Sequence, residues 1–217
     1  MVARPIDLDT WSRREQFAFF RTYLNPYFSI TATVDVTRLL EVTRSENGPR
    51  FSIASTYMAT QVANGIEAFR CRIRGAGAVV HEIVHCNSTI ALPDHTFAFA
   101  QYEYSESFSL FCERADAVDR RISQHREKLA SDPLDDDVLY FSSIPWISFT
   151  GFNNAHRLEN PDSVPRIVFG KYYDDRGRWL LPVCVDVHHA LVDGYHIGLF
   201  FDAYQGLLNA AAETLAT

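Results

Sequence analysis

The segment HHALVDG at residues 188–194 brings together two adjacent histidines, an aspartate and a glycine. As a residue type, histidine has a side-chain pKa of about 6.5, so near neutral pH it can take a proton from a hydroxyl or a thiol. General-base assistance of this kind is commonly worth roughly 10²–10⁴ in rate. We predict that His189 is such a general base.

The residues on either side of His189 predict how it is positioned. Strict alternation separates two strand faces, Val183, Val185 and Val187 on one and Cys184, Asp186 and His188 on the other. From residue 193 onward, apolar side chains recur at helical spacing. His189 therefore ends a strand just before a turn, where its ring can face a cleft while rigid elements hold it from both sides.

Asp193 and Gly194 follow at the turn itself. Asp193 lies four residues beyond His189, so we expect it to stabilise the turn or cap the helix rather than to orient the imidazole. A buried carboxylate there needs a cation as its partner. Gly194 lets the backbone bend where a side chain would clash.

Other roles for the histidines have to be weighed. His189 could be a buried structural histidine, and we interpret His188, beside Asp186, as structural and His196 as ordinary packing. His189, Asp193 and His196 also have the i, i+4, i+7 spacing of ligands on one helix face. That reading requires His189 to lie inside the helix, whereas the alternation puts it at the strand end, so we expect no metal.

The remaining periodicities indicate a mixed α and β chain that forms one domain over residues 1–217. Helical spacing appears at 10–23 with Thr10 as a possible N-cap, briefly after residue 36, at 53–69 and at 107–129. Strand patterns appear at 30–36, 79–85, 96–104, 146–152, 167–173 and 179–188. The polar residues 174–177 end in Gly and predict a hairpin between the last two strands.

Composition excludes several classes of protein. The net charge is −7 and the basic residues form no dense stripe, so nucleic acid is not expected as a partner, although the arginine clusters could meet a phosphorylated small molecule. The sequence has neither a secretory signal pattern nor a long apolar stretch, which favours a cytoplasmic protein without a membrane partner. The four cysteines are widely spaced, which predicts reduced, mostly buried thiols.

The segment HHALVDGYHIGLF resembles the active-site segment of the chloramphenicol acetyltransferase family. IDLDTWSRREQF, SSIPWISFTGFN, FGKYY and LLPVCVDVHHALVDG resemble that family in order and spacing, so the resemblance covers nearly the whole chain. It implies an α/β (α+β) fold, a two-layer sandwich of a mixed sheet with helices. It also implies a homotrimer with active sites at the subunit interfaces.

The resemblance assigns roles to individual residues. His189 matches the base that deprotonates the acceptor hydroxyl for attack on the thioester of acetyl-CoA, a cosubstrate, with no tightly bound cofactor. Ser142 matches the serine that donates a hydrogen bond to the tetrahedral oxyanion, although by itself it could be a polar residue at a strand edge. Asp193 matches an aspartate that pairs with the arginine of a WxR segment, here Arg13, with Arg14 as an adjacent competitor.

The resemblance also implies which residues meet the substrates. Trp146 and Tyr172 match positions in the coenzyme A channel, although either could be a core aromatic, and Leu24 and Phe28 match apolar positions on the acceptor side. Departures from the family pattern occur at Phe20, Cys86, Asn154 and Val168, all on the acceptor side.

We therefore expect O-acetylation of a small acceptor by direct transfer. The alternatives are the same chemistry on another hydroxyl or amine acceptor, with acetyl-CoA or another acyl donor, and a non-catalytic binding domain.

Overall fold

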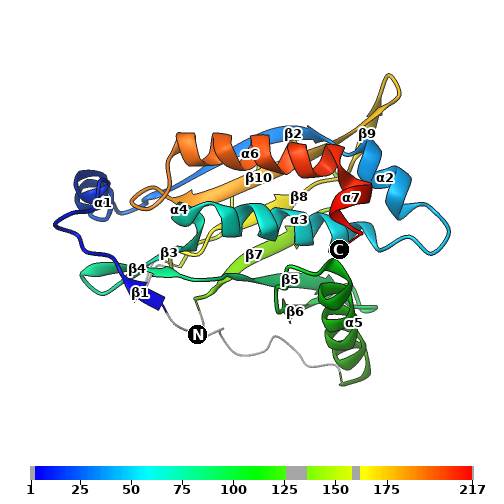
Figure 1. The fold of residues 1–217 in the computed structure, drawn as a ribbon, viewed down its shortest axis with the longest axis horizontal. Coiled ribbons are helices and arrows are strands. Elements are labelled where there is room, and N and C mark those ends of the chain that lie inside the picture. The colour runs from blue at the N-terminus through cyan, green and yellow to red at the C-terminus, as the bar shows by residue number, and fades with distance from the viewer. Residues whose placement is uncertain (1–2, 126–135, 158–161, 217) are drawn as a thin grey trace.

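The structure is a computed structural model that describes residues 3–125, 136–157 and 162–216. Its centre is a seven-stranded sheet (Figure 1) with the order β2-β10-β8-β7-β5-β6, in which β9 also pairs with β10. The strands are β2 (Tyr27–Asp35), β5 (His85–Ala91), β6 (Phe97–Tyr102), β7 (Val138–Ser143), β8 (Arg166–Phe169), β9 (Tyr173–Asp175) and β10 (Arg178–His188). The β5–β7 and β7–β8 pairs are parallel and the other pairs are antiparallel, so the sheet is mixed.

Helices cover one face of this sheet. In Figure 1, α3 (Phe51–Gly65) and α6 (Gly194–Asn209) lie side by side across the strands, and both contact the sheet. The other helices are α1 (Arg14–Phe20), α2 (Thr37–Thr43), α4 (Glu67–Arg70), α5 (Phe108–His125) and α7 (Ala211–Thr214). The predicted two-layer α+β architecture is confirmed.

A second, three-stranded sheet lies near α1 and α4 and was not predicted. Its order is β1 (Ala3–Pro5), β4 (Gly77–His81), β3 (Cys71–Arg74), and all its pairs are antiparallel. Asp136 accepts hydrogen bonds from Arg74 in β3 and lies 2.9 Å from the Nε2 atom of His81 in β4. This carboxylate connects the small sheet to the start of β7.

The strand β10 carries the predicted alternation. Val183, Val185 and Val187 belong to the core that the helices cover. On the other face, the Cys184 thiol lies 3.5 Å from the carbonyl of Phe152, and Asp186 is 1% exposed. Irregular chain at 144–157 therefore lies against the back of β10.

Three predicted strands differ from the structure, and one of them is the run at 167–173, where β8 ends at Phe169 and β9 begins at Tyr173. Residues 146–152 form no strand, because the chain turns at Pro145, which has no N–H for a ladder. The run at 79–85 is divided between β4 and β5, and between them Asn64 makes both of its side-chain hydrogen bonds to the backbone of Val84. Strand β7, which carries Ser142, was not predicted.

Helix boundaries also differ from the prediction. The first helix begins at Arg14, and Thr10 is not its N-cap, since its hydroxyl bonds to Asp7 instead. The helix predicted at 53–69 is divided into α3 and α4 at Ile66, which has extended backbone. The predicted helix at 107–129 is present as Phe108–His125, and residues 126–129 lie outside the described residues.

The predicted hairpin after residue 173 is present. Asp175 in β9 pairs with Arg178 in β10, which leaves a two-residue turn in which both Arg176 and Gly177 have positive φ. Two positive φ angles are what a type I′ hairpin turn requires.

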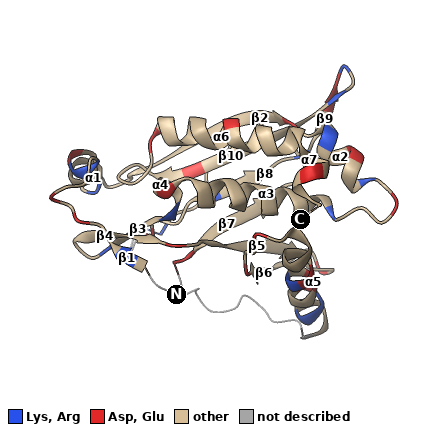
Figure 2. Ribbon diagram, viewed as in Figure 1, with Lys and Arg blue, Asp and Glu red and all other residues tan. Residues whose placement is uncertain are grey.

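Figure 2 shows Lys and Arg interspersed with Asp and Glu over helices and loops. All four cysteines are free, and Cys71, Cys86 and Cys184 are buried. In the described part of the chain, no helix has both the length and the apolar character to cross a membrane.

Candidate active site

The turn after β10 holds His189 by its backbone and its ring. The His189 amide donates to the carbonyl of Pro26 at 2.8 Å, and its Nδ1 atom lies 3.2 Å from the carbonyl oxygen of Val192. A carbonyl can only accept, so the hydrogen of this bond belongs to Nδ1. The neutral ring then carries its lone pair on Nε2, the atom that can act as a base.

Two aromatic side chains flank the His189 ring. Phe20, at the end of α1, stacks on it with a centroid distance of 3.8 Å and an interplanar angle of 15°. Phe28, in β2, lies 4.5 Å away at 47°. The chain thus places two of the predicted acceptor-side residues against the predicted base.

Asp193 is the N-cap of α6 and joins three parts of the molecule. Its carboxylate accepts from the backbone amides of Tyr195 and His196, at 3.0 and 3.4 Å, and His196 Nδ1 accepts from the Asp193 amide. These are the two halves of a capping box. The predicted packing role of His196 is therefore corrected, because its ring completes this cap.

Arg13 is the arginine that meets Asp193. Its Nη1 atom donates to Asp193 Oδ2 at 2.5 Å, and its side chain is 14% exposed against 32% for Asp193. Arg14, the adjacent competitor, is exposed and lies 3.5 Å from Asp9. Burial would raise the pKa of Asp193, but the hydrogen bond from Arg13 and the nearby His196 hold it below its ordinary value.

His188 points to the other side of the sheet and is 5% exposed. Its Nδ1 atom accepts from the Ala190 amide at 3.2 Å, and the Tyr27 ring meets it edge-on at 5.2 Å. Burial lowers the pKa of His188 to about 4. These contacts support the structural role that alternation predicted.

A buried polar network lies next to His188, and sequence reasoning missed most of it. Asp186 accepts from Ser29 at 2.7 Å and lies 3.1 Å from the Nε2 atom of His156, whose ring stacks on Tyr27 at 3.6 Å. Burial would raise the pKa of Asp186, but these hydrogen bonds lower it. A polar residue within the alternating β10 pattern was the only signal, and nothing in the sequence indicated its distant partner His156.

Ser142 lies near the end of β7. It is in register with Val168 in β8, and its hydroxyl is 3.3 Å from that of Thr89 in β5. Thr89 was not predicted, because its only link to Ser142 is that their strands are neighbours.

The register separates Ser142 from His189 within one chain. Ser142 pairs with Val168, and Val168 pairs with Cys184, which precedes His189 by five residues. At about 3.3 Å per residue along the strand and about 4.8 Å per strand across the sheet, the two Cα atoms are roughly 19 Å apart. The two side chains of one copy cannot act on the same carbonyl group.

The predicted coenzyme A residues lie in different surroundings. Trp146 is 73% exposed in the turn after β7. Tyr172 is half-buried between Phe51 and Trp179, with the Arg44 guanidinium over its ring.

Of the other residues predicted to bind the acceptor, Cys86 and Val168 are buried, whereas Leu24 and Asn154 are not. Cys86 is fully buried and its thiol lies 2.9 Å from the Thr60 hydroxyl, so its assignment as an acceptor contact is corrected. Val168 is buried between neighbouring strands and is 1% exposed, so its assignment as an acceptor contact is also corrected. Leu24 has the opposite environment, with 94% of its surface exposed. Asn154 lies half-buried in the segment behind β10.

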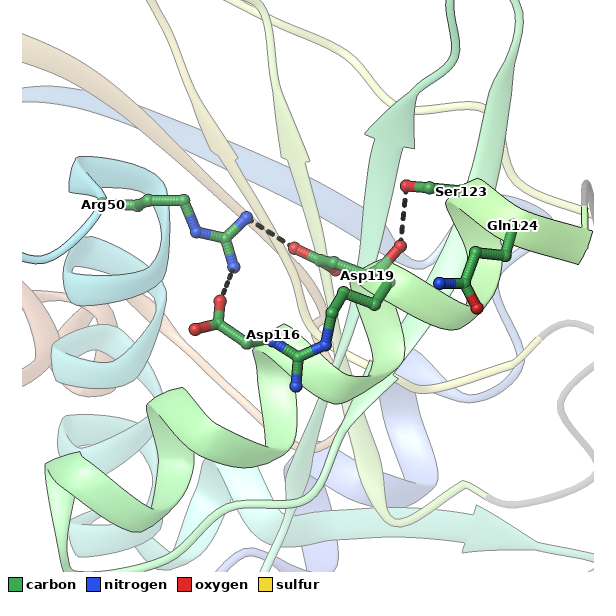
Figure 3. A pocket seen from close by; sticks show the side chains of 6 residues that line it. Arg50, Asp116, Asp119, Ser123 and Gln124 are labelled. Carbon is green, nitrogen blue, oxygen red and sulfur yellow. Dashed lines mark hydrogen bonds and ion pairs between the residues drawn. The ribbon is translucent and has the colours of Figure 1, made fainter.

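A hollow of about 440 Å³ lies elsewhere, at the start of α3 and along α5 (Figure 3). Arg50 bridges two carboxylates there, Asp116 at 2.7 Å and Asp119 at 2.5 Å. None of its lining residues is one of the predicted site residues. Its ion pairs fasten α5 to the start of α3.

Among the residues that the structure describes, no group of three or more His, Cys, Asp or Glu side chains is arranged to hold a metal ion. His189 precedes α6, so the helical i, i+4, i+7 spacing does not apply to it.

Comparisons with known proteins agree with this fold. A family model described as "Chloramphenicol acetyltransferase" matches residues 1–205. A chloramphenicol acetyltransferase of Streptomyces acrimycini is 32% identical over 94% of this chain and 93% of its own, and chloramphenicol acetyltransferase 2 of Escherichia coli is 30% identical over 92% and 94%. A solved structure of a chloramphenicol acetyltransferase has a TM-score of 0.84 and 25% identity, covering 95% of this chain and all of that chain.

The Arg13–Asp193 pair should couple strongly to stability. Arg13→Ala and Asp193→Ala should each destabilise the protein, because each leaves the other charge partly buried, and the double mutant should lose less than the sum. Since Asp193 is about one-third exposed, we expect a coupling of about 1–2 kcal/mol, less than for a fully buried pair. Urea unfolding of wild type, the two single mutants and the double mutant measures this coupling energy. Arg14→Ala is the control, and additive losses would show that the contact contributes nothing.

His188 should make stability depend on pH. Its folded-state pKa of about 4 lies below the usual value for histidine. The contribution of His188 to the free energy of unfolding is therefore complete above about pH 6.5 and is lost as the pH falls towards 4. The loss should reach about 3 kcal/mol. His188→Asn keeps an acceptor for the Ala190 amide but does not titrate, so its free energy of unfolding should fall less steeply over this range. His95→Asn, at an exposed turn, is the control. Parallel curves for wild type and His188→Asn would contradict the assignment.

Proposed function

The chain belongs to the chloramphenicol acetyltransferase family and is an acyltransferase, and we propose that it transfers the acetyl group of acetyl-CoA directly to a hydroxyl of a small acceptor. The observation that carries this proposal is the His189 ring, whose Nδ1–H bonds to Val192 while Phe20 and Phe28 flank it. This arrangement leaves Nε2 as a base beside an apolar surface. Because acetyl-CoA is an intracellular metabolite, we place the enzyme in the cytoplasm.

In the proposed reaction, Nε2 of His189 accepts the proton of the acceptor hydroxyl as its oxygen attacks the thioester carbonyl. The C–O bond forms and the carbonyl becomes a tetrahedral oxyanion, to which the Ser142 hydroxyl donates a hydrogen bond. The intermediate then collapses, the C–S bond breaks, and the sulfur of coenzyme A takes the proton from the imidazolium. No acyl-enzyme is formed, and both products leave neutral at the reacting atoms.

The rest of the catalytic turn supports this role of His189. Nε2 can receive a proton only if the ring keeps one orientation, and the ring is attached to a turn that Asp193 closes. Arg13 and the first amides of α6 share the Asp193 carboxylate. We propose that Arg13, Asp193 and Gly194 are positioning residues and do not touch the substrates.

The site is proposed to form between two copies of the chain in a homotrimer. Within one copy, the strand register keeps Ser142 roughly 19 Å from His189. A second copy can supply Ser142 to the His189 of the first. The exposed apolar side chains of Leu24 and Trp146 support this assembly, since a neighbouring subunit would cover them.

We propose that Trp146 and Tyr172 line the channel for coenzyme A, and that Phe20, Leu24 and Phe28 contact the acceptor. Phe20 has no phenolic hydroxyl, so a polar group of chloramphenicol that meets it loses a partner. The acceptor is therefore proposed to be a small alcohol with apolar surface at this point, with chloramphenicol a poorer substrate.

Removing the base or the oxyanion donor should abolish acetyl transfer without unfolding the protein. His189→Ala should lower kcat by about 10²–10⁴ and Ser142→Ala by about 10²–10³. The measurement is acceptor-dependent release of coenzyme A, with circular dichroism to verify folding. An His189→Ala enzyme within a few-fold of wild type would rule out His189 as the base.

Mixing the two inactive variants tests the shared site. When the two chains are unfolded and refolded together, a site that takes His189 from one copy and Ser142 from another regains both residues in about a quarter of cases. Activity should therefore return to about that fraction of wild type, and each variant refolded alone is the control. If the mixture stays inactive while native mass spectrometry shows mixed trimers, the two residues do not meet across an interface.

The acceptor preference can be tested at Phe20. Phe20→Tyr should raise kcat/KM for chloramphenicol by about 10–100-fold, because it restores one buried hydrogen-bond partner. Val168→Thr, at a position with 1% exposure, should leave this value within a few-fold. Steady-state kinetics decide the matter. An unchanged value in Phe20→Tyr would mean that the missing hydroxyl does not determine the acceptor.

A further inference from the structure

The hydroxyls of Ser142 and Thr89 form a pair on the face of the central sheet opposite α3 and α6. Ser88 in β5 is in register with Phe141 in β7, and Thr89 and Ser142 are the next residues of these two parallel strands (Figure 1). Phe141 belongs to the core, so alternation turns Ser142 to the opposite face. The two hydroxyl oxygens are 3.3 Å apart. The register of two strands thus holds a second hydroxyl beside the proposed oxyanion donor.

The sheet is apolar on either side of this pair. Thr89 is in register with Phe99 in β6, and Ser142 with Val168 in β8, and neither neighbour has a side-chain donor or acceptor. Within the part of the chain that the structure describes, each of the two hydroxyls has the other as its only hydrogen-bond partner. Both residues are half-buried, so a substrate can still reach them from outside the sheet.

The number of hydrogens determines which of the two hydroxyls must donate during the reaction. A hydroxyl carries one hydrogen and two lone pairs. If Ser142 gives its hydrogen to an oxyanion, its contact with Thr89 is kept only when Thr89 donates and Ser142 accepts. A hydroxyl that accepts a hydrogen bond is polarised and becomes a stronger donor itself. Donation from Thr89 therefore directs the hydrogen of Ser142 away from Thr89 and strengthens the bond that Ser142 makes there.

The side chain of Thr89 is suited to this task. Because threonine is branched at Cβ, its χ1 angle is restricted, and its hydroxyl keeps one position more firmly than the hydroxyl of a serine. The separation of 3.3 Å is longer than the ~2.7–2.8 Å that is usual between two hydroxyl oxygens. Hydrogen bonds of catalytic groups are often long before substrate binds and shorten in the transition state. The pair is thus placed to tighten as negative charge develops on the substrate.

We propose that Thr89 is a positioning residue for acetyl transfer, which donates to Ser142 Oγ and so orients the Ser142 hydroxyl toward the oxyanion. This role rests on the proposed function of Ser142 as the oxyanion donor. Thr89 keeps its own proton throughout and does not touch the substrates. Because the role needs a hydroxyl at both positions, it disappears when either one is removed.

Steady-state release of coenzyme A from acetyl-CoA, with chloramphenicol as the acceptor, tests the proposal. Thr89→Val has nearly the same shape but no hydroxyl, and it should lower kcat by about 3–10-fold at unchanged KM, as for one hydrogen bond that acts in the transition state. Thr89→Ser keeps the donor and should stay within about twofold of wild type. Hydrolysis of acetyl-CoA without an acceptor passes through the same kind of oxyanion and is a second readout.

Two controls separate the orientation of Ser142 from a general defect. In the Ser142→Ala background, Thr89→Val should cause no further loss, because the hydroxyl that Thr89 orients is already gone. Thr31 is in register with Cys184 in the same sheet, three strands from Ser142, and Thr31→Val should leave kcat unchanged. The free energies of unfolding of all variants verify that they fold.

Each result decides between the two roles. A Thr89→Val enzyme with the kcat of wild type, while Ser142→Ala is impaired, overturns the role of Thr89 and leaves the proposed function intact. An equal loss from Thr89→Val with and without Ser142 also overturns it, since the effect then does not pass through Ser142. If Ser142→Ala keeps the rate of wild type, or if wild type catalyses neither reaction, the proposed function and the role of Thr89 fail together.

Discussion

The carboxylate of Asp193 is the group on which the turn between β10 and α6 depends. It closes the N-terminus of α6, where backbone amides have no partner within the helix, and it pairs with Arg13 from the other end of the sequence. A side chain that meets three partners can hold β10, α6 and the chain before α1 in one arrangement. The ring of His189 is attached to this arrangement, and its own bond to Val192 then determines which nitrogen is free.

The two faces of the central sheet differ in polarity. The face under α3 and α6 is apolar, and the valines of β10 belong to its core. The other face carries polar groups, among them Ser142, Asp186 and His188, and the buried Asp186 lies next to Ser29 and His156, which are distant in the sequence. Charges and hydroxyls near the end of β10 therefore lie on well-supported strands, which suits a site that needs fixed geometry.

The segments with an unambiguous period were predicted well from the sequence. The alternation from 179 to 188 and the apolar stripe after 193 depend on β10 and α6 alone, and both elements are present with Asp193 as the cap. The segment at 146–152 was predicted wrongly, because its alternating aromatics pack as a loop after Pro145. Cys86 and Val168 were assigned to the acceptor by position, whereas their strands bury both.

The sequence by itself determined the local structure of the turn, since a histidine at a strand end followed by a capping aspartate is specified by residues that are neighbours in the chain. It also indicated Arg13 as the partner of Asp193, through the resemblance of two short segments. Only the tertiary structure decided what surrounds these groups: Phe20 stacked on His189, His156 beside Asp186, and Thr89 beside Ser142. The physical reason is the distance along the chain between the residues that make each contact. Caps and strand alternation arise from contacts over a few residues, whereas burial, stacking and cavities depend on segments that meet only after the sheet and its helices have packed.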